Sequence, residues 1–200
     1  MTDILQRIKC RGIEYMPWLV LGAVCLFIQW LHLSETFLFN RTLIEQGELW
    51  RILTAHVTHL NWNHLWLNMA GVFMVAIFFG RYVSNRYWVI SIIFISLFCS
   101  AGLMLDKQLE NYVGFSGVLH GLFIIGARYE LTRYKTSGIV LLVLIVGKLI
   151  WEQVVGSLPG SEEITGGRVA MNAHLYGALG GVVYLWLGSM GYKSKKAHDN

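Results

Sequence analysis

The chain contains 200 residues, of which 55% are hydrophobic and only 14% are charged, and its formal net charge is +4. Together with a mean hydropathy of +0.51, this composition excludes an ordinary soluble domain and is typical of a membrane protein. The basic residues form no cluster of the kind that binds nucleic acid, and the three scattered cysteines predict no disulfide framework.

Six apolar segments follow one another along the chain, and each is near the roughly 20 residues that a helix needs to cross a bilayer. The segments are residues 17–33, 64–79, 87–105, 116–129, 138–155 and 171–190. We therefore expect an all-α membrane protein with six transmembrane helices in a single domain over residues 1–200. The first segment follows Lys9 and Arg11 and lacks a small-residue cleavage site, which favours a retained signal anchor over a cleaved signal peptide.

The charged residues predict the orientation of this bundle. Lysines and arginines concentrate at both termini and in the second and fourth connections, whereas the other connections carry most of the acidic residues. The positive-inside rule then places both termini in the cytoplasm. The long first connection, about residues 34–63, would lie in the periplasm, and its length predicts a structured and functional loop. The polar, basic tail of residues 193–200 is predicted to be disordered.

Two polar residues stand out within the apolar segments. Ser116 lies in the sequence Gly114-Phe115-Ser116-Gly117, where a loop enters the fourth segment, and His174 lies near the start of the sixth. Both segments are predicted to run inward, so the two side chains would share one depth near the outer face. A serine with a histidine as its general base is the minimal equipment of a serine hydrolase working inside a bilayer.

Glycines and further polar residues support this grouping. The fourth and sixth segments each carry two glycines four residues apart, a pattern that lets membrane helices approach closely. These glycines are Gly117 and Gly121, and Gly177 and Gly181. The second segment also runs inward, with His64 at its start and Asn68 one turn deeper on the same face. Both side chains would join the Ser116 amide as donors to an oxyanion, unless Asn68 bonds a helix backbone and His64 is merely interfacial.

A metal site is the other chemistry to weigh, because His56, His59 and His64 are close in sequence. Their spacing lacks the HExxH arrangement and its general-base glutamate. The sequence also identifies no partner groups that would fix neutral imidazoles around a zinc ion. We therefore expect neither a metal nor another cofactor.

These residues carry a resemblance to a known family. The chain resembles the rhomboid intramembrane serine proteases from the first segment to Gly191, in the order and spacing of four motifs. The motifs are Trp50-Arg51, His59 with His64-x-x-x-Asn68, Gly114-Phe115-Ser116-Gly117, and Ala173-His174-x-x-Gly177-x-x-x-Gly181. The resemblance implies a rhomboid-type bundle, a Ser116 nucleophile, a His174 general base, and an oxyanion site of His64, Asn68 and the Ser116 amide. It also implies a dyad without a third carboxylate, and we expect no acidic residue at the depth of the site.

Within the family, the chain is most similar to the bacterial rhombosortases, in its six-segment form, residues 53–64 and the sequence Gly117-Val118-Leu119-His120-Gly121. This likeness implies an endopeptidase of the bacterial inner membrane whose active site faces the periplasm. The substrate would be an exported protein with a Gly-Gly site beside a C-terminal transmembrane helix, and transfer to an amine acceptor is left open. A general rhomboid protease and a catalytically silent rhomboid-like protein that binds membrane clients are the alternatives.

Five further residues have roles that the catalytic grouping does not explain. His120 stands where many rhomboids carry an aromatic residue stacked on the catalytic histidine; a hydrogen bond to His174 and a bond to a backbone carbonyl or water are both open. Lys148 and Glu152, four residues apart in the fifth segment, would pair on one helix face. A structural pair near the outer surface is favoured over a role at the substrate gate, which the fifth span borders in rhomboids. Arg51 is expected to hold the first loop together, and Trp50 to anchor it at the membrane surface.

Overall fold

The computed structural model describes residues 14–198 of the chain, with side chains described for residues 14–188. Six long helices make up most of the described chain. They are α2 (Met16–Trp30), α6 (Trp62–Phe79), α7 (Asn85–Leu105), α8 (Ser116–Arg133), α9 (Lys135–Val154) and α11 (Met171–His198). Helix α11 is drawn through His198, and the disorder expected for the tail of residues 193–200 stays a prediction. The basic residues before position 14, which contributed to the predicted orientation, lie outside the described range.

Each predicted apolar segment falls largely within one of these helices. Three regions are long and apolar enough to cross a membrane, namely Trp62–Tyr82, Asn85–Leu105 and Lys135–Val154, and α2 is a shorter apolar helix. The fold therefore agrees with an all-α membrane protein, while the number of spans and their orientation stay predictions.

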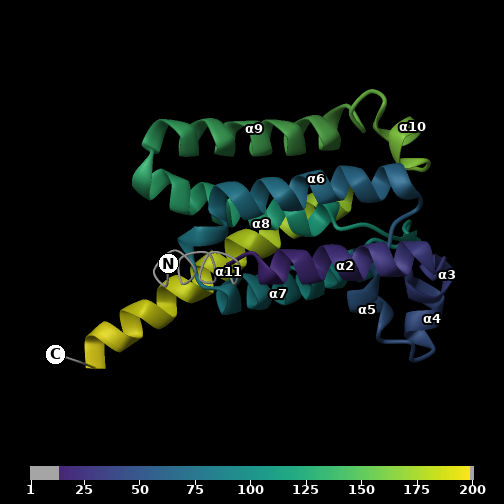
Figure 1. Cartoon of the computed structure of the whole chain (residues 1–200), viewed down its shortest axis with the longest axis horizontal. Helices are drawn as coiled ribbons and strands as arrows, with labels where there is room; N and C mark the ends of the chain where they lie inside the picture. Colours follow the sequence, from purple (N-terminus) through teal and green to yellow (C-terminus); the bar gives the residue numbers. More distant parts are fainter. Residues whose placement is uncertain (1–13, 199–200) are drawn as a thin grey trace, which may run out of the picture.

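Short elements occupy the connections. They are α3 (Ser34–Phe37), β1 (Phe39–Asn40), α4 (Arg41–Glu45), α5 (Arg51–Thr54), the 3-10 turns η1 (Ala55–Val57) and η2 (Gly80–Tyr82), β2 (Asn111–Tyr112) and α10 (Ser161–Thr165). Figure 1 shows α3, α4, α5 and α10 at one end of the bundle, with consecutive long helices running in opposite directions. Helices α6, α8 and α11 therefore all begin at this end, which we call the loop end.

Asn61 and a short strand pair hold the connections together at the loop end. The side-chain oxygen of Asn61 accepts the His64 N–H at 2.8 Å and caps α6, while its amide nitrogen donates to the Thr165 carbonyl in α10 at 2.9 Å. Strand β1 pairs with β2 in antiparallel register, with Phe39 opposite Tyr112. The first connection is thereby fastened to the segment that leads into α8.

Arg41 adds a second fastening, between the first connection and the end of α7. Its guanidinium donates to four main-chain carbonyls at 2.6 to 3.1 Å, those of Leu103, Met104, Asp106 and Leu109. The last carbonyls of a helix lack partners within the helix, and a cation at that end is favoured by the helix dipole. Arg41 therefore stabilises the loop end by satisfying groups that would otherwise be unpaired.

Helix α8 lies at the centre of the bundle, in contact with α6, α7, α9 and α11. Its closest approach is to α11, through the glycines that the sequence singled out. A Cβ atom on Gly177 would lie only 1.8 Å from the Gly117 carbonyl oxygen, and one on Gly181 would lie 2.5 Å from the Gly121 carbonyl oxygen. The two helix backbones therefore touch, which only residues without a side chain permit.

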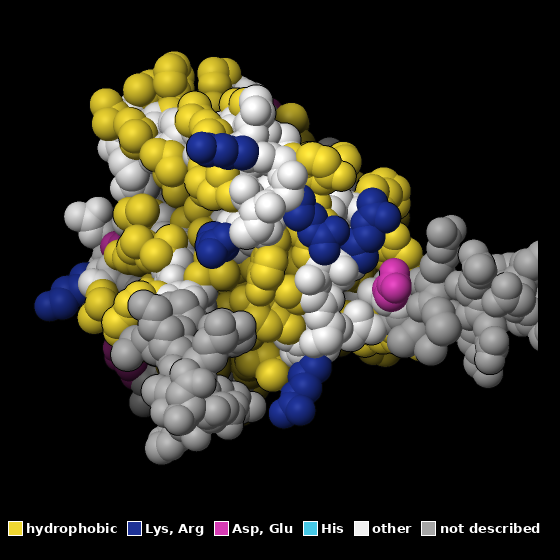
Figure 2. Space-filling model, turned by 90° about the vertical axis from the view of Figure 1, so that its left-hand side faces the viewer, with side chains coloured by type: hydrophobic (Ala, Val, Ile, Leu, Met, Phe, Trp, Pro, Cys, Tyr) yellow, Lys and Arg dark blue, Asp and Glu magenta, His cyan; other side chains and the backbone are white. Residues whose placement is uncertain are grey.

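The outer surface is apolar along the helices and basic at the end opposite the loop end. On α9, Val143, Leu144 and Ile150 are between 59% and 65% exposed, as expected for side chains that face lipid. Figure 2 shows the opposite end, where lysine and arginine side chains (dark blue) gather among hydrophobic ones. The exposed cations near the α6–α7 and α8–α9 turns are Arg81, Arg86, Arg128, Arg133 and Lys135.

Candidate active site

The structure brings Ser116 and His174 into hydrogen-bonding contact. Ser116 is the first residue of α8, and His174 lies in the first turn of α11, one turn before Gly177. The Ser116 Oγ atom lies 2.9 Å from Nε2 of His174. His174 is only 6% exposed, so its ring is held by packing as well as by polar contacts. A hydroxyl at this distance from an imidazole nitrogen can pass its proton to that nitrogen.

The segment before Ser116 is held in a conformation that suits glycine. Gly114 has a φ of +123°, in the region that favours glycine, and its N–H donates to the Ala55 carbonyl at 3.0 Å. The Tyr112 hydroxyl donates to the Gly114 carbonyl at 2.6 Å. The chain thus turns into α8 with Gly114 packed closely beside α6.

His64 and Asn68 of α6 lie beside this turn. A Cβ atom on Gly114 would lie 2.8 Å from Nε2 of His64 and 3.8 Å from Nδ2 of Asn68. The Leu60 N–H donates to Nδ1 of His64 at 3.5 Å, which assigns the ring proton to Nε2, next to Gly114. The Asn68 amide donates to the His64 carbonyl at 3.2 Å, the helix-backbone bond that was the structural alternative, and this bond uses one of its two protons.

His120 stacks on His174 and also makes two polar contacts. The two rings are 4.3 Å apart between centroids, with an interplanar angle of 22°. Nδ1 of His120 lies 2.7 Å from the Ser116 carbonyl oxygen, and Nε2 lies 3.1 Å from Nζ of Lys148. His120 therefore keeps the stacked position of the usual aromatic residue and bonds a backbone carbonyl, without a hydrogen bond to His174.

The expectation that no acidic residue lies at the depth of the site is wrong. Both carboxylate oxygens of Glu152 lie beside Nδ1 of His174, at 2.8 and 3.0 Å. Lys148 pairs with Glu152 as predicted, with Nζ 2.6 Å from Oε1. Glu152 is only 3% exposed, however, so it is buried against His174 and is not at a hydrated surface. The fifth segment runs toward the loop end, and its late residues therefore reach the depth of Ser116.

His56, His59 and His64, the histidines considered for a metal, are not the residues whose ligand atoms come together in the structure. Among the described residues, the group that comes together consists of His120, Glu152 and His174, whose ligand atoms lie within 4.8 Å of one another. The Lys148 ammonium contacts all three side chains, at 3.1, 2.6 and 3.4 Å respectively. A metal ion would have to displace this cation, because two positive charges cannot share the space between the same ligands.

His56 and His59 belong to the framework of the first connection. Nε2 of His56 lies 2.9 Å from Ser100 Oγ, and the His59 ring packs edge-on against His64, 5.1 Å between centroids. Burial lowers the pKa of His56 to about 4, because the interior disfavours the charged form. Burial, together with the nearby His64, lowers the pKa of His59 to about 3. Both rings are therefore neutral at pH 7.

Trp50 and Arg51 also serve the first connection. Arg51 is buried, and its guanidinium donates to the carbonyls of Glu35 and Leu38 at 3.0 and 2.9 Å, as well as to the Glu48 carboxylate at 2.7 Å. Trp50 is 49% exposed, and its indole lies 3.4 Å from the Thr36 carbonyl. Neither side chain is among the contacts of Ser116 or His174 described above.

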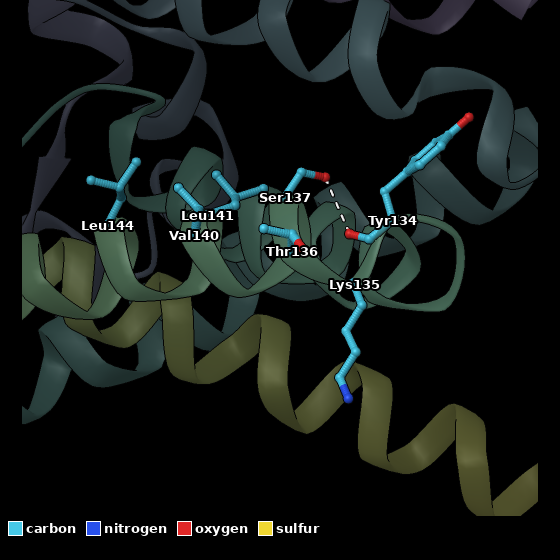
Figure 3. A pocket seen from close by; sticks show the side chains of 7 residues that line it. All are labelled: Tyr134, Lys135, Thr136, Ser137, Val140, Leu141 and Leu144. Carbon is cyan, nitrogen blue, oxygen red and sulfur yellow. Dashed lines mark hydrogen bonds between the residues drawn. The ribbon is translucent and has the colours of Figure 1, made fainter.

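A pocket of about 670 Å³ lies far from this chemistry (Figure 3). It is lined by Tyr134, Lys135, Thr136, Ser137, Val140, Leu141 and Leu144, around the α8–α9 turn. Ser116 begins α8 and this turn follows its end, so roughly 25 Å of helix separates the two. The pocket is shallow and open to the surroundings of the bundle, so it is not the site to which Ser116 and His174 belong.

Comparisons with known proteins identify the family. Residues 46–191 match the Rhomboid domain. The chain is 30% identical over 152 residues to Rhomboid-like protein 11, chloroplastic, of Arabidopsis thaliana, an alignment that covers 69% of this chain and 52% of that protein. It is 23% identical over 150 residues to "Putative rhomboid protease YdcA" of Bacillus subtilis (strain 168), covering 72% of this chain and 69% of that protein. The chain thus spans about half the length of the Arabidopsis relative.

The match covers the helices that carry every residue of the site. Helices α6, α8, α9 and the beginning of α11 all lie within residues 46–191, and the apolar surface of the bundle fits a lipid environment. Rhomboid proteins act on membrane protein substrates within the bilayer. This chain is a multi-pass membrane protein that belongs to the rhomboid family.

Proposed function

We propose that the protein is an intramembrane serine endopeptidase, with Ser116 as nucleophile and His174 as general base. The observation that carries the proposal is the 2.9 Å contact between Ser116 Oγ and His174 Nε2, made by two helices whose backbones touch one turn away. Family membership alone is not sufficient, because rhomboid-like proteins can be inactive. The inactive alternative would keep the bundle and bind membrane clients without cleaving them.

The chemistry follows from the positions of these atoms. As Ser116 Oγ bonds to the carbonyl carbon of the scissile peptide, its proton passes to Nε2 of His174 and the carbonyl electron pair moves to oxygen. His174 then gives this proton to the departing amine when the C–N bond breaks. Water repeats the sequence on the acyl-enzyme and releases the new carboxyl end.

The oxyanion would be held at the start of α8. The Ser116 amide lies at a helix N-terminus, where donors are unpaired and negative charge is favoured. Nε2 of His64 and the amide nitrogen of Asn68, which has a second proton to donate, lie beside Gly114, two residues before Ser116. Three donors around one turn resemble the arrangement that typically contributes 100-fold or more per donor in acyl transfer.

For the substrate, we propose a single-span anchor with a Gly-Gly site, cleaved near the outer face. This finer proposal rests on the likeness of residues 53–64 and 117–121 to the rhombosortases. It goes with a bacterial inner-membrane location, six spans, cytoplasmic termini and an active site facing the periplasm. The exposed arginines and Lys135 at the end opposite Ser116 support that orientation, because cytoplasmic loops are enriched in basic residues.

The test uses the full-length protein in a membrane fraction. A substrate with a Gly-Gly site, a C-terminal helix and a basic tail should be cleaved by the wild type and by Ser137→Ala, which removes an exposed serine at the far end. Ser116→Ala and His174→Ala should abolish cleavage. A fluorophosphonate probe should label the wild type and Ser137→Ala, and Ser116→Ala should block labelling.

Each alternative predicts a different outcome. Cleavage that persists in both Ser116→Ala and His174→Ala contradicts the proposed chemistry. If the wild type is not labelled by the probe and cleaves no anchor, the silent client-binding protein is favoured. Equal cleavage of a matched substrate in which Leu-Leu replaces Gly-Gly would favour a general rhomboid protease.

A further inference from the structure

The contact between Glu152 and His174 joins two helices, and the two residues are 22 positions apart in the chain. Both carboxylate oxygens of Glu152, on α9, approach the same nitrogen, Nδ1 of His174 on α11, at 2.8 and 3.0 Å. Glu152 is 3% exposed and His174 is 6% exposed, so little water competes for either group. Burial of a carboxylate charge is unfavourable unless its partners offset the lost hydration, so this carboxylate needs the contacts that it makes.

Lys148 supplies the compensating charge. Its ammonium lies 2.6 Å from Oε1 of Glu152 and 3.1 Å from Nε2 of His120. Because an ammonium can only donate hydrogen bonds, Nε2 of His120 must be an acceptor, and its Nδ1–H then donates to the Ser116 carbonyl at 2.7 Å. The ring stacked on His174 is therefore fixed in one tautomer.

The same reasoning assigns the protons of His174. Its Nε2 must accept the Ser116 hydroxyl proton for the serine to be activated, so its own proton must be on Nδ1. The Glu152 carboxylate can only accept, and it lies where that Nδ1–H would donate. Every donor in the network then faces an acceptor, apart from the 3.4 Å approach of Lys148 Nζ to His174 Nδ1, which is a contact between two donors.

We propose that Glu152 is a positioning residue that completes a Ser116–His174–Glu152 triad, an inference that rests on the proposed function. Glu152 holds the His174 ring in the tautomer that leaves Nε2 free to accept the Ser116 proton. Its negative charge also stabilises the imidazolium that exists while His174 carries two protons. Lys148 orients the carboxylate, and it bridges that carboxylate to His120.

Two competing roles for Glu152 fit part of the geometry. In the first, Glu152 and Lys148 form only a structural ion pair on α9, and loss of either partner should then be equivalent. In the second, His120, Glu152 and His174 bind a metal ion, although the Lys148 ammonium occupies the space among them. A structural ion pair gives Glu152 no reason to lie beside Nδ1 of His174, the nitrogen that decides the tautomer of that ring.

The decisive variant is Glu152→Gln, assayed in the full-length protein. Glutamine keeps the size of the side chain and an oxygen for Lys148 in the place of Oε1. Its NH₂ group would then replace Oε2, the nearer of the two oxygens to Nδ1 of His174, and would face that nitrogen as a donor. The ring proton would then move to Nε2, which could no longer accept from Ser116. We expect kcat to fall on the order of 100-fold or more with KM unchanged, and fluorophosphonate labelling to slow by a similar factor. The matched control is Glu163→Gln, at an exposed acid of α10.

Lys148→Met separates the triad from the ion pair. It removes the ammonium and leaves Glu152 bonded to His174, so its loss of kcat should be at least tenfold smaller than that of Glu152→Gln. Equal losses in the two variants would overturn the proposal in favour of a structural pair. Activity that is lost with chelators and restored by a divalent cation would overturn it in favour of a metal.

The activity of the wild type and the melting point of Glu152→Gln separate failure of the triad from failure of the proposed function. If the wild type neither cleaves nor takes up the probe, the proposed function itself fails. If the wild type is active and Glu152→Gln stays within threefold of it, only the triad fails. Should Glu152→Gln melt far below the wild type, Glu152→Asp decides: a lower kcat at unchanged KM supports the proposal, and an unchanged kcat refutes it.

Discussion

Gly177→Ala should strongly reduce activity, although Gly177 is not one of the proposed reacting groups. The Cβ atom of alanine would lie 1.8 Å from the Gly117 carbonyl oxygen and 2.4 Å from its carbonyl carbon. Real Cβ contacts essentially never fall below 3.0 Å, so α8 and α11 must separate by about 1.2 Å or more at this level. The Gly117 carbonyl lies in the first turn of α8 and is packed directly against α11, so it cannot yield by a side-chain rotation.

This separation acts directly on the site. Ser116 precedes Gly117 on α8, and His174 lies one turn before Gly177 on α11. Their 2.9 Å contact would lengthen to about 4 Å if the helices part by the required distance, which is beyond hydrogen-bonding range. Since a misplacement of about 1 Å can cost 100-fold in rate, we expect kcat to fall by roughly that factor or more.

The assay compares cleavage in proteoliposomes with the midpoint of thermal unfolding. Gly188→Ala is the matched control, because it makes the same change in the same helix at a position where a Cβ atom meets nothing within 4 Å. That control should keep full activity. A Gly177→Ala protein that cleaves within threefold of the wild type would refute the argument that backbone contact between α8 and α11 sets the geometry of the site.

Three further predictions concern the surroundings of the site. His120→Phe should fold and keep the stack on His174, but it loses both polar contacts of His120, so kcat should fall about tenfold and the pH–rate profile should change. Arg51→Lys should lower the free energy of unfolding by about 2 kcal/mol, measured by thermal melting, because an ammonium cannot reproduce the three bonds of the fork. The low pKa of His59, about 3, means that only the unfolded chain gains a proton as pH falls below 6.5. Stability should therefore fall by about 2 kcal/mol from this residue by pH 5, and His59→Phe should make the pH dependence shallower by that amount.

Each of these predictions has a result that would contradict it. An unchanged pH–rate profile in His120→Phe would mean that the polar contacts of this ring are incidental. Arg51→Lys should be compared with Arg168→Lys, an exposed arginine, and equal melting points would remove the loop-fastening role. A His59→Phe protein that loses as much stability between pH 7 and 5 as the wild type does would show that this ring does not titrate on unfolding.

The sequence was sufficient to predict the helices and the meeting of Ser116 with His174. Apolar length gives the helix positions, and the alternation of helix directions gives the depth of each polar residue. The glycine spacing on α8 and α11 then predicts close approach, because backbone contact leaves no room for another side chain. These features are local or periodic, so they can be seen without knowing how the helices are arranged around α8.

Glu152 could not be assigned by the same reasoning, although a signal was present. Its four-residue spacing from Lys148 suggested a partner on its own helix, and that partner exists. The second partner, His174, depends on the rotation of α9 about its axis and on which helix packs beside it, and neither is a periodic property of the sequence. The outward direction of the fifth segment placed Glu152 at the depth of Ser116, which was the available clue. The role of Arg41 was missed for a similar reason. Every residue has a main-chain carbonyl, so the sequence does not show which carbonyls an arginine binds.

Helix α9 is the most weakly enclosed of the three regions that meet the length and hydropathy of a span, with 22% of its window buried compared with 39% and 44% for the others. It packs mainly against α8 and α11, and it alone carries Glu152 and Lys148. An outward displacement of α9 by little more than 1 Å would break the 2.8 Å contact between Glu152 and His174. The position of α9 thus determines whether Glu152 contacts His174. Any movement of this weakly enclosed helix would therefore change the orientation of the imidazole that contacts Ser116.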